Sequence, residues 1–173
     1  MGKLYHAQVI NPNPNQCTFE VQKVETEVKK KFNTHIAIAP TKNMDRMEWF
    51  VEKATEIGVD EISLVKTQNS ERVIIKTERL VKKAISAMKQ SLKYTLPKIN
   101  ELKLLKDVLD ISANVKCIAA YVDSKNPTLL SNKVGAGKNL VLIGPEGDFT
   151  ENEISNAITM GWEPVSLGNS RLR

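Results

Sequence analysis

The chain has 173 residues and a mass of 19.4 kDa, which is enough for one domain and part of another. Hydrophobic residues make up 41% and charged residues 26%, which is typical of a folded globular protein and excludes a disordered chain. No run approaches the ~18 apolar residues of a membrane span, and no apolar signal-peptide core is visible. Cys17 and Cys117 are far apart and form no metal-ligand pair. We therefore expect a reduced, cytoplasmic setting with no membrane and no bound metal.

The first thirty residues have the pattern of a β-hairpin. Residues 4–10 and 17–21 read as strands, and the Asn-Pro-Asn-Pro-Asn sequence of residues 11–15 is a turn-rich connection. An isolated hairpin is only marginally stable in water, so we expect this one to be the end of a larger β domain. Residues 25–33 are polar and lysine-rich and are interpreted as a linker.

From residue 34 onward, short apolar strands alternate with amphipathic helices. Strands are expected at residues 35–39, 61–65, 117–122, 140–143 and 164–167. Helical spacing of apolar residues predicts helices over 47–57, ended by Gly58, and over 81–92. Thr150-Glu-Asn-Glu153 is a capping box that begins a third helix. This order predicts βα units, and therefore a parallel sheet covered on both faces.

The positive charge is concentrated in one segment of the chain. Residues 66–106 contain eleven Lys or Arg and three Glu, a balance of +8, whereas the chain as a whole carries +5. Such asymmetry predicts a polyanionic partner, with nucleic acid first. The equally weighted alternative is a solvated, lysine-rich helix face.

Two glycine-containing loops follow expected strands. Ile143-Gly-Pro-Glu-Gly-Asp-Phe149 leads directly into the third helix, and Leu167-Gly168 begins the last segment. Each loop alone would be compatible with a tight turn. Because ligands of parallel α/β sheets bind beyond the carboxyl ends of the strands, the two loops together predict a shared ligand site.

Other common ligand-binding motifs are incomplete or absent. Gly135-Ala-Gly-Lys138 lacks the first glycine and the Ser or Thr of a phosphate-binding loop, and it precedes a strand. There is no G-x-G-x-x-G dinucleotide motif and no G-x-S-x-G nucleophile motif. His6 and His35 stand alone in different segments, so we expect structural roles for both.

Four segments, in order, resemble the signatures of one family. Residues 53–59 (KATEIGV) resemble a K-A-T-E-L-G-V helix, and residues 70–97 an S-E-R…R…Q-S-x-R…P segment. Residues 143–153 (IGPEGDFTENE) resemble IGPEGG-F-S/T-x-x-E, and residues 167–173 (LGNSRLR) the start of LG-x-x-x-LR-x-E-T-A. On these motifs the chain is identified as a member of the bacterial 16S rRNA (uracil-N3) methyltransferases, in the SPOUT (α/β-knot) superfamily. It departs from the family pattern at Lys93, Asp148 and Ser170-Arg171.

The resemblance implies an α/β fold of the SPOUT knot type, with a parallel sheet, over residues 34–173. Residues 1–33 would be the end of a PUA-like RNA-binding β domain and a linker. Because the last signature stops at Arg173, we expect the knotted domain to be truncated there. The resemblance also implies S-adenosylmethionine (SAM) as cofactor, 16S rRNA of the small ribosomal subunit as substrate, and a homodimer. A dimer would also cover apolar residues such as Trp162 and Leu172.

The resemblance further assigns roles to individual residues. Arg173, and after it Arg171, would be the catalytic cation; Glu146 could act as a base, but it is more readily a loop cap. The segment after strand 117–122 would form a third wall of the cofactor site. RNA phosphates would be contacted by residues of the basic segment. The expected cofactor-binding residues are Gly144, Pro145, Glu146, Gly147, Leu167, Gly168 and Leu172, and the expected RNA-binding residues are Arg72, Arg79 and Lys93.

Two alternatives to this function stay open from the sequence. The first keeps the knot and SAM but changes the target to a ribose 2′-hydroxyl or a tRNA base. The second is a non-catalytic RNA-binding or ribosome-assembly protein that uses the basic segment and the hairpin.

Overall fold

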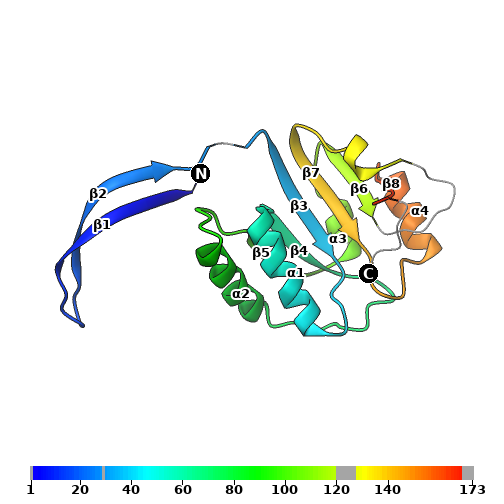
Figure 1. Cartoon of the computed structure of the whole chain (residues 1–173). Helices are drawn as coiled ribbons and strands as arrows, with labels where there is room; N and C mark the ends of the chain where they lie inside the picture. Colours follow the sequence, from blue (N-terminus) through cyan, green and yellow to red (C-terminus); the bar gives the residue numbers. More distant parts are fainter. Residues whose placement is uncertain (1, 29, 120–127, 169–173) are drawn as a thin grey trace.

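The computed structural model describes residues 2–28, 30–119 and 128–168, which form a hairpin and an α/β domain (Figure 1). In the hairpin, β1 (Lys3–Asn11) pairs antiparallel with β2 (Thr18–Thr26). The hairpin extends away from the domain and leaves Val9, Ile10 and Phe19 more than half exposed. These apolar side chains are not covered by any other described part of the chain.

The α/β domain is built on a six-stranded sheet in which all neighbouring strands are parallel, as predicted. The strand order is β5-β4-β3-β7-β6-β8. The strands β4 and β5, which follow β3 in the sequence, lie on one side of it. The later strands β6, β7 and β8 lie on its other side. The direction of winding therefore reverses between β3 and β7. The strands are β3 (Phe32–Ile38), β4 (Glu61–Lys66), β5 (Lys98–Leu104), β6 (Val115–Ala119), β7 (Gly137–Ile143) and β8 (Glu163–Val165).

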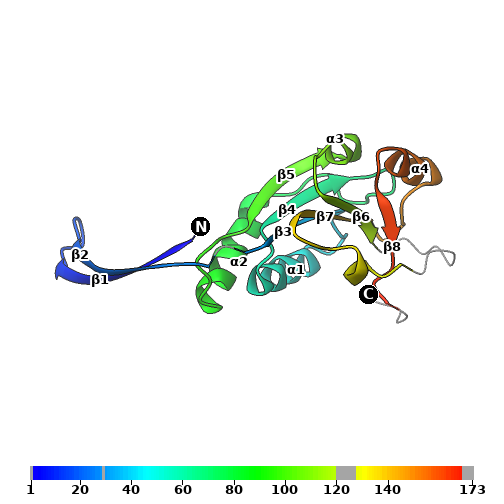
Figure 2. The same cartoon turned by 90° about the horizontal axis from the view of Figure 1, so that it is seen from above.

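Helices cover both faces of this sheet, which confirms the expected layers (Figure 2). The helices α1 (Met44–Ile57) and α2 (Thr77–Gln90) pack on one face, over β3, β4 and β5. The helices α3 (Leu105–Leu109) and α4 (Glu151–Thr159) pack on the other face. A short 3₁₀ turn, η1 (Leu130–Asn132), precedes β7. None of the helices in the described ranges is long and apolar enough to cross a membrane.

The helix ends follow the signals in the sequence. Helix α1 begins at Asn43, whose side chain accepts a hydrogen bond from the Asp45 backbone, and it ends at Gly58, which has a left-handed φ of 94°. Helix α4 begins with the predicted capping box, in which the Thr150 hydroxyl and the Glu153 carboxylate each accept from the other's backbone N–H.

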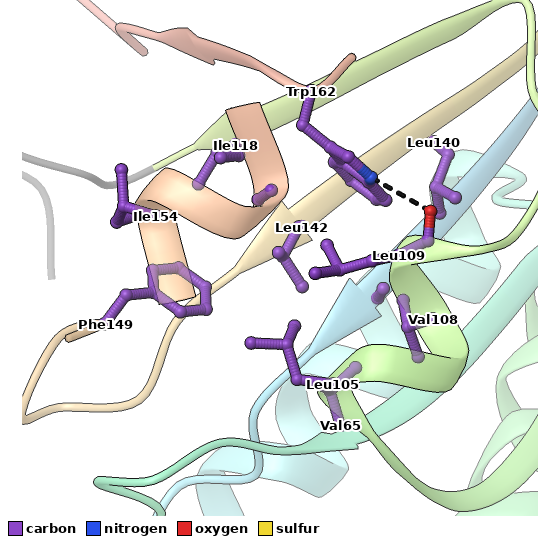
Figure 3. Close-up of a cluster of buried hydrophobic side chains, with 12 residues drawn as sticks. Val65, Leu105, Val108, Leu109, Ile118, Leu140, Leu142, Phe149, Ile154 and Trp162 are labelled. Atoms are coloured by element: carbon purple, nitrogen blue, oxygen red, sulfur yellow. Dashed lines mark hydrogen bonds between the residues drawn. The ribbon is translucent and has the colours of Figure 1, made fainter. Parts of the chain in front are cut away.

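The core on the α3–α4 face is centred on Trp162 (Figure 3). The indole is 1% exposed, and its Nε1 donates a hydrogen bond to the carbonyl oxygen of Leu109 at 3.2 Å. The expectation that Trp162 needs cover from a second subunit is therefore wrong, because α3 of the same chain already covers it. Neither α3 nor β5 was predicted from the sequence. Leu172 lies outside the described residues, as does the threading of the C-terminal segment after residue 168.

Several boundaries differ from those expected. Strand β2 continues to Thr26 and β3 begins at Phe32, so the interval between them is shorter than the predicted linker of residues 25–33. The second half of β2, after Val21, did not indicate a strand, because both faces of the hairpin are exposed and need no apolar alternation. Helix α2 begins at Thr77 instead of Val81 and ends at Gln90, before Leu92, which adopts a left-handed φ of 54°.

His35 belongs to a buried polar network where the strands begin. Its Nε2 lies 2.9 Å from the Ser63 hydroxyl, and its Nδ1 lies 3.7 Å from Glu61, too far for a hydrogen bond. Asn100 donates to both the Glu61 carboxylate and the Ser63 hydroxyl. Burial, assisted by nearby lysines, lowers the pKa of His35 to about 4 although Glu61 opposes the shift. His35 is therefore neutral at pH 7 and structural, as expected.

This network makes folding stability depend on pH. Because the folded pKa of His35 lies below its unfolded value of about 6.5, the unfolded chain binds the proton more readily. The contribution of His35 is complete above pH ~6.5 and is lost as the pH falls toward 4, by up to roughly 3 kcal/mol. Urea unfolding of the native chain and of His35→Gln across this range should show a shallower pH slope in the variant. His6→Gln, on the exposed hairpin, is the control; equal slopes in all three proteins would contradict the assignment.

Candidate active site

The winding of the sheet reverses between β3 and β7, and this is where parallel α/β folds bind ligands. The two strands pair over seven residues, from Phe32 with Gly137 to Ile38 with Ile143. The pairing continues past the strand ends, because the Ala39 N–H donates to the Ile143 carbonyl oxygen at 2.9 Å. The chain that follows β3 therefore lies beside the predicted glycine loop that follows β7.

An apolar trough of about 470 Å³ runs along β3 and β7 to this end of the sheet. It lies on the same face as α1 and α2, beyond the part of the sheet that they cover. Ile36, Val141 and Ile143 line it from the two central strands, and Ala119 lines it from the end of β6. Leu167 lines it too, so the residues at which the two glycine loops begin border the same trough. The segment expected as a third wall follows Ala119 and lies outside the described residues.

The glycines of the loop after β7 lie close to neighbouring side chains. A Cβ at Gly144 would lie 2.7 Å from the ring of Phe149, which is buried in the core. A Cβ at Gly147 would lie 3.2 Å from that of Asn69. Gly168, in the second loop, has open space around it but a φ of 128°, which residues other than glycine rarely adopt. Gly144 therefore needs to be glycine because of the close Phe149 ring, Gly147 leaves little room for a Cβ, and Gly168 needs glycine for its backbone conformation.

Contacts from other loops fix the glycine loop. The Glu146 carboxylate accepts a hydrogen bond from the backbone of Lys42 at 3.2 Å, as the cap interpretation predicts. The Asn69 amide donates to the carbonyl oxygens of Gly147 and Asp148 at 3.1 and 3.0 Å. Asn69 was not anticipated; it directly precedes the Ser70-Glu-Arg72 motif, and nothing in its sequence context marks it. The loop is therefore held from two sides before any ligand binds.

Asp148 occupies the position at which the family signature has its second glycine. Its φ of 60° is left-handed, which explains why glycine suits this position. The strain on an aspartate here is offset locally, because its carboxylate accepts a hydrogen bond from the next backbone N–H, of Phe149, at 2.7 Å. The departure from the signature therefore leaves the loop conformation intact.

The three expected RNA-binding residues lie in different settings. Arg72 donates to the carbonyl oxygen of Lys42, at 2.6 Å from Nη2, so it helps to hold the loop after β3. Arg79, in the first turn of α2, pairs with Glu48 and Asp45 of α1. Lys93 follows the other end of α2, close to Gly58 and Lys30. The structure does not bring the three together.

The remaining assigned residues can be placed only in part. Pro145 lies between Gly144 and Glu146 in the fixed loop, and its carbonyl oxygen accepts from the Asp148 N–H. Arg171, Leu172 and Arg173 lie outside the described residues. No three His, Cys, Asp or Glu side chains in the described part of the chain gather so that they could hold a metal ion.

The trough and its loops fit a nucleoside-like cofactor. Its volume is within the ~300–1,000 Å³ typical of small-molecule sites, and apolar side chains form its floor. Ile143 and Leu167, at which the two glycine loops begin, border the trough, so the loops lie next to it. The residues present are therefore suited to SAM.

Comparisons with known proteins agree with this geometry. Residues 28–173 match the model of the RNA methyltransferase domain family. The ribosomal RNA small subunit methyltransferase E of Mesomycoplasma hyopneumoniae is 32% identical over 170 residues, which cover 94% of this chain and 72% of that protein. The chain belongs to this family of RNA methyltransferases. The protein of the same description from Aquifex aeolicus is 28% identical and is covered to 76% by 99% of this chain.

Solved structures of the family share the whole described fold, hairpin included. A crystal structure from Porphyromonas gingivalis, described as a probable rRNA-methyltransferase, has 43% identity and a TM-score of 0.90. It matches 99% of this chain and 74% of its own. A methyltransferase structure from Legionella pneumophila, described as a complex with the cofactor SAM, has 25% identity and a TM-score of 0.84, over 99% of this chain and 73% of its own.

Gly144 offers a direct test of the loop geometry. We expect Gly144→Ala to lower the free energy of unfolding by about 1–3 kcal/mol, because the new methyl group must displace the buried Phe149 ring. The matched control is Gly135→Ala, where nothing lies within 4 Å of the new Cβ, and a change within about 0.5 kcal/mol is expected. Urea denaturation measures both. Equal effects of the two substitutions would contradict the close approach of Gly144 to the core.

Proposed function

We propose that this protein transfers a methyl group from SAM to N3 of a uridine in the rRNA of the small ribosomal subunit, in the cytoplasm. The observation that carries the proposal is that both signature loops begin at the border of one apolar trough, at Ile143 and Leu167, beside the switch point of the sheet. Family membership supports the reaction class, and the names of the relatives support the substrate.

The cofactor supplies an activated methyl group on its sulfonium centre. The protein's own contribution is to hold SAM and orient it toward the uridine. Backbone groups of Gly144–Gly147 and Leu167–Gly168 would bind the polar parts of SAM, with Leu172 beside them. The trough floor, including Ile36 and Val141, would exclude water. Because Asn69 and Lys42 already fix the first loop, little ordering is needed on binding, and such positioning lowers the barrier.

The uridine presents a different requirement, since its N3 carries a weakly acidic imide proton. Loss of that proton leaves negative charge on the uracil, which a nearby cation would stabilise. By the family signature we assign this role first to Arg173 and then to Arg171. Glu146 is less suited to act as the base, because its carboxylate already caps the neighbouring loop at Lys42.

Labelled methyl transfer tests the proposal. The full-length protein, given labelled SAM and small subunits from a strain that lacks the enzyme, should produce 3-methyluridine, identified by mass spectrometry. Arg173→Ala should lower kcat at least tenfold, because it removes charge stabilisation of the transition state, and change the Kd of SAM by less than threefold.

The alternatives predict other outcomes of the same assay. A product methylated on a ribose 2′-hydroxyl, or transfer to tRNA only, would identify another RNA methyltransferase of the same fold. Absence of SAM binding in calorimetry would favour a non-catalytic assembly protein. An Arg173→Ala variant with full activity would remove the arginine from the mechanism while leaving the reaction assigned.

We also propose a homodimer, because apolar side chains along the trough remain exposed. Trp162 is covered within the chain, but Phe32, Val134 and Leu167 on the border of the trough remain between 43% and 54% exposed. A second copy packed along this face would remove them from water. Sedimentation at micromolar concentration should give twice the mass of the chain tested; a monomer mass would contradict the dimer.

A further inference from the structure

The described lysines and arginines divide into two groups according to whether a carboxylate neutralises them. On α1, α2 and the carboxyl ends of the strands, the two kinds are mixed. Lys42, Lys53, Arg79 and Lys83 are paired with carboxylates, whereas no carboxylate among the described residues lies within ion-pair distance of Arg46, Lys66, Arg72, Lys76, Lys82 or Lys89. Lys42 lies 3.0 Å from Glu71, and Arg79 pairs with Glu48. Lys53 and Lys83 share the Glu52 carboxylate. A phosphate group that approached the paired cations would have to compete with their carboxylate partners.

The opposite edge of the sheet, where the parallel strands begin, has unpaired lysines. Lys31 directly precedes β3, Lys138 is the second residue of β7, and Lys93 follows α2. None of these three has a carboxylate within ion-pair distance among the described residues. Lys30 and Lys98 lie at the same edge but are paired with Asp60 and Glu61. We call Lys31, Lys93 and Lys138 the edge lysines.

Neighbouring contacts show that the edge lysines form one surface. Lys30, Lys31 and Lys138 line the same open hollow of about 460 Å³. The ammonium groups of Lys30 and Lys93 both lie within 4 Å of one point beside Gly58. Lys98 and Lys138 both act on the charge of His35, so the basic surface continues across the starts of β3, β7 and β5. Its lysines come from segments far apart in the sequence.

The hairpin leaves the domain at this same edge (Figure 1). Tyr94 and Thr95, the two residues after Lys93, donate hydrogen bonds to Glu25 and Glu27 at the base of β2. Gly2 packs against the Tyr94 carbonyl group so closely that a Cβ would not fit. The edge lysines therefore lie between the base of the hairpin and the α/β domain.

We infer that the edge lysines bind the phosphate backbone of the substrate RNA, as a second contact region remote from the methyl-transfer site. Strand β3 separates the two edges by roughly 23 Å, since it has seven residues at about 3.3 Å each. An RNA that lay across the start of the sheet could therefore reach the trough end with only a few nucleotides. Phosphate contacts of this kind fix the position of the RNA and do not read its sequence.

This inference rests on the proposed function for the identity of the RNA. The experiment below can contradict the inference without contradicting the proposed function, and the reverse. The variant Lys31→Gln/Lys93→Gln/Lys138→Gln is compared with Lys53→Gln/Lys83→Gln/Lys133→Gln. The control removes the same charge from lysines that are already paired with carboxylates. Binding of a protein-free transcript of the small-subunit rRNA is measured against KCl concentration, and SAM binding is measured by calorimetry.

We expect the edge variant to weaken RNA binding at least tenfold and to reduce the log–log salt slope by about 2 to 3, because each lost phosphate contact removes roughly 0.7–0.9. SAM affinity should stay the same in both variants. An edge variant that bound the transcript as the control does would overturn the inference. A defect seen with whole subunits but not with the transcript would also overturn it, because the surface would then bind a ribosomal protein. Failure of the native protein to methylate subunits would instead count against the proposed function.

Discussion

The parallel pairing of β3 with β7 is the constraint on which the rest of the site depends. It joins two segments a hundred residues apart, and it brings the loop after Ile38 beside the loop after Ile143. The register of this pairing also decides which side chains lie on each face of the sheet. A slip of one residue would turn the side chains of one of the two strands over, so that either Ile36 or Val141 would point toward the α3–α4 side and the floor of the trough would be broken. The cofactor site is therefore a consequence of strand register as much as of the signature loops.

The glycine loop is attached to the hydrophobic core through Phe149. The ring is 8% exposed and belongs to the core cluster around Trp162 (Figure 3). Its edge lies against Gly144, where a Cβ would come within 2.7 Å of it. The loop is thus held in place by the same contacts that fold the domain. A loop held in this way keeps its backbone groups aimed at a ligand without an additional entropic cost at binding. The left-handed Asp148 is tolerated in the same framework, because the surrounding contacts fix its conformation.

Periodicity in the sequence predicted the elements that bury one apolar face, and it missed those that do not. Helices α1 and α4 have strong caps and regular spacing, and both were expected. Strand β5 (KINELKL) is at the edge of the sheet and half-polar, and α3 is shorter than two turns, so neither has a readable period. The error about Trp162 followed directly, because its cover comes from the unpredicted α3. The site loops were predictable from their glycines, but the support from Asn69 was not.

The charge pattern shows a further limit of sequence reasoning. Arg79 and Lys93 belong to the same basic segment and lie at opposite ends of α2, whose 14 residues span roughly 21 Å. Packing of α1 against α2 places Glu48 on Arg79, whereas the turn after α2 places Lys93 beside Lys30. The net charge of a segment can therefore indicate a polyanionic partner, but only tertiary packing decides which cations stay free to meet it. In this fold, the carboxylates of α1 pair with Lys53, Arg79 and Lys83, whereas no described carboxylate pairs with Lys93, at the end of the sheet remote from the cofactor loops.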